Sequence, residues 1–162
     1  MYKRQIFKDY DSDLERTDAL INSYVTNLEQ DSTGNLWAGT FAGVSRMISE
    51  EGKGIFKNYK SAFGNPNALS NNSIKKLYND SHERLWIGTQ TGLNLYNPKE
   101  DTFTQFGREE GLPSDYILGL AEDSKSQLWI MTTYGILKAR YNDSLNILEP
   151  FKESLYRAFR IP

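Results

Sequence analysis

The sequence contains the stretch Asp80-Ser-His-Glu-Arg-Leu-Trp-Ile-Gly-Thr89, and two further copies of it occur in the same chain. The copies are Asp31-Ser-Thr-Gly-Asn-Leu-Trp-Ala-Gly-Thr40 and Asp123-Ser-Lys-Ser-Gln-Leu-Trp-Ile-Met-Thr132. The three tryptophans of the protein occupy the same place in each copy, at intervals of 49 and 43 residues. Equivalent leucines and glycines extend the match on both sides: Leu20, Leu69, Leu112, Gly43, Gly92 and Gly135. The chain is therefore a repeat array, which has to be recognised before any other fold assignment.

Each repeat predicts four short strands. In the second copy, apolar and polar residues alternate over 74–77, aromatic and β-branched residues fill 85–89, and further strands follow at 92–96 and 103–106. Asp-Ser turns and a glycine reversal separate the strands. Four strands in roughly 43 residues are typical of a β-propeller blade. The predicted fold is all-β, with three four-stranded antiparallel blades that form a partial propeller.

The ends of the chain are out of phase with the blades. Ile6-Phe-Lys-Asp-Tyr10 matches Ile55-Phe-Lys-Asn-Tyr59, so it predicts an orphan outer strand that belongs to a preceding blade. We therefore divide the chain into segments: an outer strand in 1–17, blades in 18–67, 68–110 and 111–154, and the start of a following blade or a tail in 155–162. On this interpretation the chain starts and stops inside a larger array.

Composition excludes several classes of protein. The net charge is −2, with 19 basic and 21 acidic residues interspersed, so no basic face for nucleic acid is expected. No apolar run approaches the roughly 20 residues that span a bilayer, and Met1 to Tyr10 carry no signal-peptide core. The absence of cysteine excludes disulfides, thiolate nucleophiles and cysteine-based metal sites.

The stretches Leu85 to Asn97 and Leu69 to Asp80 closely resemble the two-component regulator propeller repeat. The resemblance covers the chain from Ile6 to about Phe151, with departures at Met131 and Ile136 in the third copy. It implies the extracytoplasmic, periplasmic sensor region of a bacterial hybrid histidine kinase, and a role in signal transduction through recognition of a saccharide or another cue. The kinase and phosphoacceptor portions of such proteins are absent from this sequence.

The repeated residues are expected to be structural. We assign Trp37, Trp86 and Trp129 to the core between blades, because a tryptophan in the same strand position of every blade buries a large apolar area. The same assignment holds for Phe56, Tyr59, Phe103 and Phe106. Asp31, Asp80 and Asp123 are expected to stabilise turns, since their spacing lacks the alternating oxygen ligands of a calcium loop.

No catalytic residue, metal site or cofactor is expected. The only histidine, His82, lies in a turn, and no nucleophile–base pair or phosphate loop stands out. The chain is therefore expected not to be an enzyme.

Loop chemistry gives the candidate binding residues. The connections from a fourth to a first strand and from a second to a third strand emerge on one face of a propeller, and here they carry amides, hydroxyls and aromatics. The candidates are Phe41, Asn72, Gln90, Tyr116 and Tyr134. Asn71 and Ser73 are better explained as turn caps. This chemistry suits a polar ligand such as an oligosaccharide, or a protein partner.

Three functions remain open: a ligand-sensing propeller, a protein-interaction module without a small ligand, and a propeller enzyme of the lyase type. A single histidine argues against the enzyme. Three blades are too few for a closed ring, and repeat arrays depend on covered end faces. We therefore expect self-association, for example a six-blade ring of two chains, or association with further blades of a longer chain.

Overall fold

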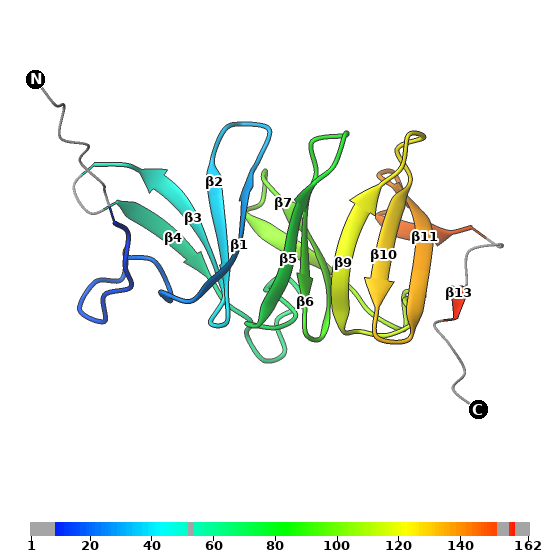
Figure 1. Ribbon diagram of the computed structural model, residues 1–162, viewed down its shortest axis with the longest axis horizontal. Helices are drawn as coiled ribbons and strands as arrows, with labels where there is room; N and C mark the ends of the chain where they lie inside the picture. Colours follow the sequence, from blue (N-terminus) through cyan, green and yellow to red (C-terminus); the bar gives the residue numbers. More distant parts are fainter. Residues whose placement is uncertain (1–8, 52–53, 152–155, 158–162) are drawn as a thin grey trace, which may run out of the picture.

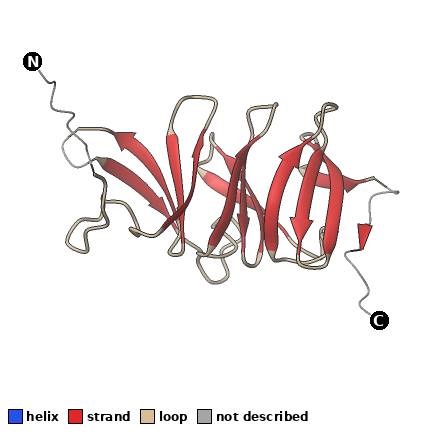
Figure 2. Cartoon of the chain, viewed as in Figure 1, coloured by secondary structure: helices blue, strands red, loops and turns tan. Residues whose placement is uncertain are grey.

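The computed structural model describes residues 9–51, 54–151 and 156–157, and every regular element in them is a strand (Figure 2). The strands are β1 Val25–Gln30, β2 Leu36–Thr40, β3 Val44–Ser49, β4 Ile55–Tyr59, β5 Ile74–Asn79, β6 Leu85–Thr89, β7 Gly92–Asn97, β8 Thr102–Phe106, β9 Ile117–Glu122, β10 Leu128–Thr132, β11 Gly135–Asn142, β12 Ile147–Pro150 and β13 Tyr156–Arg157. No helix that could cross a bilayer occurs among these residues.

The strands form three antiparallel meanders that stand side by side in sequence order (Figure 1). The first sheet is β1 to β4 and the second is β5 to β8. The third is β9 to β12, with β13 added against β11. The expected all-β fold with three four-stranded blades is confirmed. Figure 1 shows an open row, in which the hairpins β1–β2, β5–β6 and β9–β10 all point to the same end.

The expectations for the chain ends fall mostly outside the described residues. Residues 6–8 of the expected orphan strand are not described, and Asp9 and Tyr10 are not in a strand. The ring of Tyr10 packs edge-on against Phe56, at 5.9 Å between centroids. At the other end, β13 pairs with Gly135 and Ile136 of β11. These two residues of the 155–162 segment therefore lie against the third sheet.

Two close seams hold the row together, and a glycine on the second strand of a blade makes each one. A Cβ atom built on Gly39 would lie 2.7 Å from Ile74 Cγ2, and one on Gly88 would lie 2.5 Å from Ile117 Cγ2. Any side chain there would overlap the isoleucine of the next blade. We call the side of a blade that carries such an isoleucine its leading face, and the opposite side, which carries the tryptophan, its trailing face.

The tryptophans lie in the seams as expected where a following blade covers them. Trp37 and Trp86 are fully buried, whereas Trp129 on the third blade is partly exposed. Trp37 packs on Tyr96 of the second blade at 4.7 Å, and Trp86 packs on Tyr141 of the third at 5.4 Å. The four other aromatic residues assigned to the core are also buried: Phe56, Tyr59, Phe103 and Phe106.

The repeated aspartates stabilise turns, and each one also binds its tryptophan. Asp80 Oδ1 accepts hydrogen bonds from the backbone N–H of His82 (2.9 Å) and Arg84 (3.0 Å). Its Oδ2 accepts from Trp86 Nε1 at 2.8 Å and from Arg84 Nε at 2.7 Å. Asp31 and Asp123 bind the indoles of their own repeats at 2.8 and 3.1 Å. Burial alone would raise the pKa of Asp123, but hydrogen bonds from the Trp129 indole, the Lys125 backbone and the Lys138 side chain outweigh it and hold the pKa below its ordinary value.

A charged network closes the outer part of the first seam. Arg46 Nη1 donates to Tyr96 Oη at 2.7 Å, and the hydroxyls of Tyr96 and Tyr59 each donate to Asp101 Oδ1 at 2.7 Å. Lys57 pairs with the other oxygen of Asp101. Burial alone would raise the pKa of Asp101, but the hydrogen bonds from Lys57, Tyr96 and Tyr59 lower it to about 2. Burial and the bond to Asp101 raise the pKa of Tyr59.

Candidate ligand-binding site

A polar cap fixes the residue just before the inner strand of each blade, which is the first strand of the blade: β1, β5 or β9. The side-chain oxygen of the cap accepts a hydrogen bond from the backbone N–H two residues later, as in an Asx or Ser turn. The bonds run from Tyr24 N to Asn22 Oδ1 (2.8 Å), from Ser73 N to Asn71 Oδ1 (2.8 Å) and from Tyr116 N to Ser114 Oγ (3.2 Å). The caps are thus occupied by backbone, and the side chains of Tyr24 and Tyr116 take equivalent places at this end of the sheets.

The turns between second and third strands present a second set of side chains beside the first. In each turn a threonine hydroxyl donates to the carbonyl of a glycine that has positive φ. The pairs are Thr40–Gly43 (2.8 Å), Thr89–Gly92 (2.9 Å) and Thr132–Gly135 (2.9 Å). These bonds close the turns and leave Phe41, Gln90 and Tyr134 exposed between them.

Each inner strand has a β-bulge at its second residue. In the second blade this residue is Lys75. A bulge redirects a side chain that would otherwise follow the strand alternation. Lys75 Nζ lies 5.1 Å from the centroid of the Phe41 ring and 5.4 Å from that of Tyr116. These rings belong to the first and third blades, so the lysine joins all three.

Tyr24 completes this arrangement. Its ring stacks on Phe41 with 4.8 Å between centroids and 25° between planes, although Tyr24 is 65% and Phe41 48% exposed. We call Tyr24, Phe41, Lys75 and Tyr116 the aromatic strip. The strip combines three exposed or partly exposed aromatic rings with one ammonium group. No carboxylate of the described residues forms an ion pair with Lys75.

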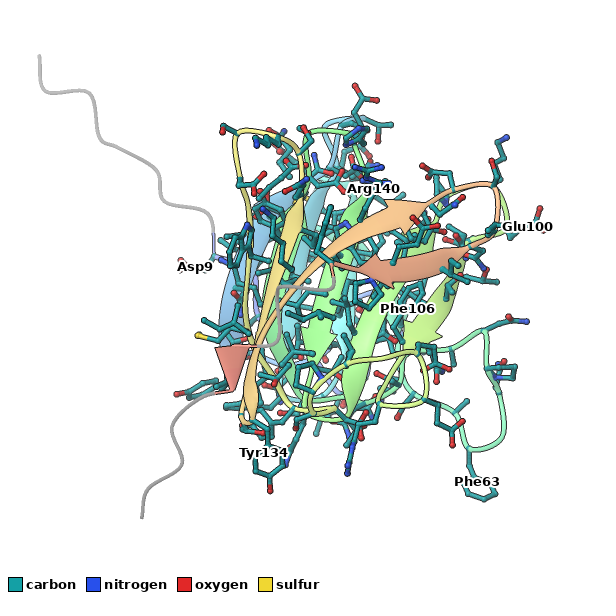
Figure 3. All side chains as sticks on the ribbon, turned by 90° about the vertical axis from the view of Figure 1, so that its right-hand side faces the viewer. Asp9, Phe63, Glu100, Phe106, Tyr134 and Arg140 are labelled. Atoms are coloured by element: carbon teal, nitrogen blue, oxygen red, sulfur yellow. The ribbon has the colours of Figure 1, made fainter. Side chains whose placement is uncertain are left out.

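Only some of the binding residues predicted from the sequence lie together in the structure. Phe41 and Tyr116 come together through Lys75. Tyr134 is 69% exposed at the same end of the third blade (Figure 3), but no described contact joins it to the strip. Gln90 is exposed, and its backbone N–H bonds to Ser73 O at 3.1 Å. Asn72 Oδ1 accepts from Ser61 N at 2.7 Å, so this oxygen holds the preceding loop.

Sequence reasoning selected neither Lys75 nor Tyr24. Tyr24 could have been found, because it shares the repeat position of Tyr116. Lys75 gave no such signal, because its counterparts Thr26 and Leu118 differ from it in chemistry and a lysine in a strand normally indicates a solvated side.

A long loop extends the same end of the molecule. Ser61 and Leu69 form an isolated parallel bridge that closes the loop between β4 and β5. Phe63 at its tip is fully exposed and lies at the same end as Tyr134 (Figure 3). An open depression of about 720 Å³ lies beside it, lined by loop residues and by Gln105.

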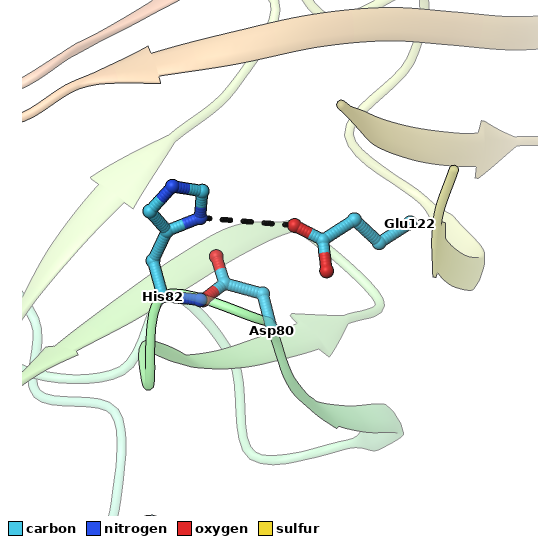
Figure 4. A group of neighbouring side chains, drawn as sticks. All are labelled: Asp80, His82 and Glu122. Atoms are coloured by element: carbon cyan, nitrogen blue, oxygen red, sulfur yellow. Dashed lines mark hydrogen bonds and ion pairs between the residues drawn. The ribbon is translucent and has the colours of Figure 1, made fainter. Parts of the chain in front are cut away.

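Asp80, His82 and Glu122 form a cluster at the opposite end (Figure 4), with one ligand atom of each within 4.8 Å of the others. His82 Nδ1 lies 3.8 Å from Glu122 Oε1. The oxygens are already used: those of Asp80 by backbone, Arg84 and Trp86, and those of Glu122 by Ser81 N and Oγ, both at 2.8 Å. A metal would displace these bonds beside the Arg84 cation, so the cluster fits a contact between blades and not a metal.

Comparison with known proteins agrees with the repeat pattern. The family model described as two component regulator propeller matches residues 19–42, 68–91 and 111–134. Each match runs from the connection before the inner strand through the turn after the second strand, so it includes the positions of Tyr24, Phe41, Lys75 and Tyr116. A search of curated proteins finds no match.

Two solved structures from B. thetaiotaomicron share the arrangement. One is the extracellular domain of a protein described as a hybrid two component system, BT3049, with 25% identity and a TM-score of 0.71 over 93% of this chain. The other is the extracellular domain of BT4673, described as a one component system, with 23% identity and a TM-score of 0.59 over 88% of this chain. The present chain spans about a fifth of each domain, 19% in both cases.

Proposed function

Because this chain carries three two-component regulator propeller repeats, we propose that it forms part of the extracytoplasmic sensing region of a bacterial two-component regulator, and that the aromatic strip binds its ligand. The likeness to an extracellular domain over 93% of the chain supports the compartment. The contact of Lys75 with rings of two other blades is the observation that carries the site, because it assembles one surface from three repeats.

The chemistry of the strip suits a saccharide. Aromatic faces bind the apolar face of a sugar ring with little loss of side-chain entropy, and an ammonium group adds a hydrogen-bond donor and charge. Tyr24, Phe41 and Tyr116 supply the rings, and Lys75 supplies the donor. Hydroxyls and amides from the neighbouring turns, such as Gln90, surround the strip with further polar groups.

The test is isothermal titration of the chain against panels of neutral and acidic oligosaccharides. Replacement of Phe41 and Tyr116 by Ala should abolish the binding of any saccharide that the unmodified chain binds. A matched control is Tyr134→Ala, since Tyr134 is exposed at the same end without contact to the strip. Unchanged affinity in the Phe41/Tyr116 double variant would remove the strip from the site.

A protein-interaction surface is the second candidate function, and Phe63 favours it. A fully exposed phenylalanine at a loop tip contributes nothing to the core, whereas aromatic side chains are enriched in protein interfaces. Cross-linking from a photoreactive residue in place of the exposed Ala62, beside Phe63, would separate the two functions. Capture of a protein partner that Phe63→Ser prevents, with no saccharide bound, would establish the second.

A further inference from the structure

The two seams inside the chain define what a leading face needs. Apolar side chains on the first two strands of a blade are sealed against the blade before it. In the second blade these are Ile74, Leu77 and Leu85, and in the third they are Ile117, Leu120 and Leu128, all at most 8% exposed. The first blade carries the same pattern as Val25, Leu28 and Leu36, which are 38%, 62% and 36% exposed. Its leading face thus has the chemistry of a seam and no sufficient cover among the described residues.

The trailing faces are not equivalent to each other. Ile74 packs against Gly39 and Ile117 packs against Gly88. A Cβ atom on these glycines would lie 2.7 and 2.5 Å from the respective isoleucine. Met131 takes the same strand position in the third blade, and its side chain is 43% exposed. A blade that docked there as the second and third blades dock would place its isoleucine or valine inside the methionine.

A second difference, on the neighbouring strand β9, compensates for the presence of Met131 in place of glycine. Met131 pairs across the sheet with Gly119, whereas Gly39 pairs with Asn27 and Gly88 pairs with Lys76. A Cβ atom on Gly119 would lie 3.1 Å from Met131 Cε, so the missing side chain makes room for the methionine. The large and the small residue have changed places between the two strands, and Met131 is accommodated in its own blade.

We infer that this chain docks further blades at one end only. The leading face of the first blade binds the trailing face of another blade of this repeat type that carries glycine at the contact position. The trailing face of the third blade is closed to that geometry by Met131. This includes the leading face of a second copy, so a head-to-tail ring of two chains, one form of the self-association expected from the sequence, does not form.

The experiment restores the contact glycine on the trailing face of the third blade. The opened chain carries Met131→Gly and Gly119→Asn, which copy the first blade, together with Leu28→Glu, which disables its own leading face. Mixed with unmodified chain in sedimentation velocity, it should give a complex of twice the mass of either partner. The control chain carries Leu28→Glu alone and should give no complex with unmodified chain.

Each result decides one half of the inference. A complex between the control chain and unmodified chain would show that Met131 does not close the trailing face. If the opened chain forms no complex, although circular dichroism shows it folded, the leading face is not a docking surface. A second opened chain with Met131→Gly and Leu28→Glu, but unaltered Gly119, guards against a folding defect from the asparagine. Failure of both folded opened chains overturns the inference.

Discussion

Trp86 Nε1 donates a 2.8 Å hydrogen bond to Asp80 Oδ2, six residues earlier in the chain, and the same bond recurs in the first and third repeats. The bond joins two features that the sequence presents as separate, the turn and the core aromatic. The aspartate holds the hairpin turn with one oxygen and fixes the indole with the other. A polar tie therefore orients the largest side chain of each seam.

We expect Asp80→Ala to lower the free energy of unfolding by about 3–5 kcal/mol, because it leaves the Arg84 charge and the Trp86 N–H without their buried partner. Urea unfolding followed by tryptophan fluorescence measures this loss. Asp123→Ala is the matched control, and its effect should be smaller because its carboxylate is 25% exposed. Equal losses in the two variants would contradict the role of burial.

The two tryptophans Trp86 and Trp129 should differ in the same way. Trp86 is fully buried in a seam, so Trp86→Ala should cost about 3–5 kcal/mol. Trp129 is partly exposed on the trailing face of the third blade, and its replacement should cost clearly less. Thermal unfolding by circular dichroism gives both values. A greater loss at Trp129 would mean that the third blade is the better packed one.

Alanine should be costly at the seam glycine and nearly neutral at the equivalent Met131. Gly88→Ala should destabilise the fold by about 1–3 kcal/mol, because the new Cβ overlaps Ile117 Cγ2. Met131→Ala at the equivalent position should change stability little, since the side chain is 43% exposed. Chemical denaturation of both variants tests the pair. A neutral Gly88→Ala would show that the second seam can relax without cost.

Acid should weaken the first seam through Asp101. Its pKa falls from 3.8 to about 2 on folding, so its contribution is complete above pH 4 and is lost as the pH falls toward 2. After solvent screening of a carboxylate that is 30% exposed, we expect a loss of about 1 kcal/mol over this range. The measurement compares urea midpoints of the unmodified chain and Asp101→Asn at pH 5 and pH 2.5. The difference between the two proteins should shrink at the lower pH, and a constant difference would contradict the assignment.

The repeat made most of the fold predictable. Three copies of one pattern placed every main strand, because turn signals and alternation agree in all three, and they placed Trp37 and Trp86 in the seams. The indole bond to aspartate was not predicted, since a separation of six residues has no meaning until the hairpin register is known. The extra pairing of Tyr156–Arg157 with β11 lay beyond the reach of the pattern for the same reason.

The candidate site was predictable only where it repeats. Tyr116 and Phe41 stand in loops of known position, so their common face followed from the topology of a blade. Their contact through Lys75 depends on a bulge in β5, and the sequence of one strand does not show which of its residues stays unpaired in the ladder. The asparagine caps show the reverse case, in which a suggestive polar cluster is consumed by backbone hydrogen bonds.

The tie between aspartate and tryptophan also has a consequence for how such a chain can change in length during evolution. Donor and acceptor lie within one hairpin, so duplication or loss of a whole repeat carries the tie along intact. Only the seams require a new neighbour to fit, and there the requirement reduces to one glycine opposite one isoleucine. Insertion of repeats should therefore be tolerated between the first and second blades and between the second and third, whereas growth past the third blade would first need glycine in place of Met131.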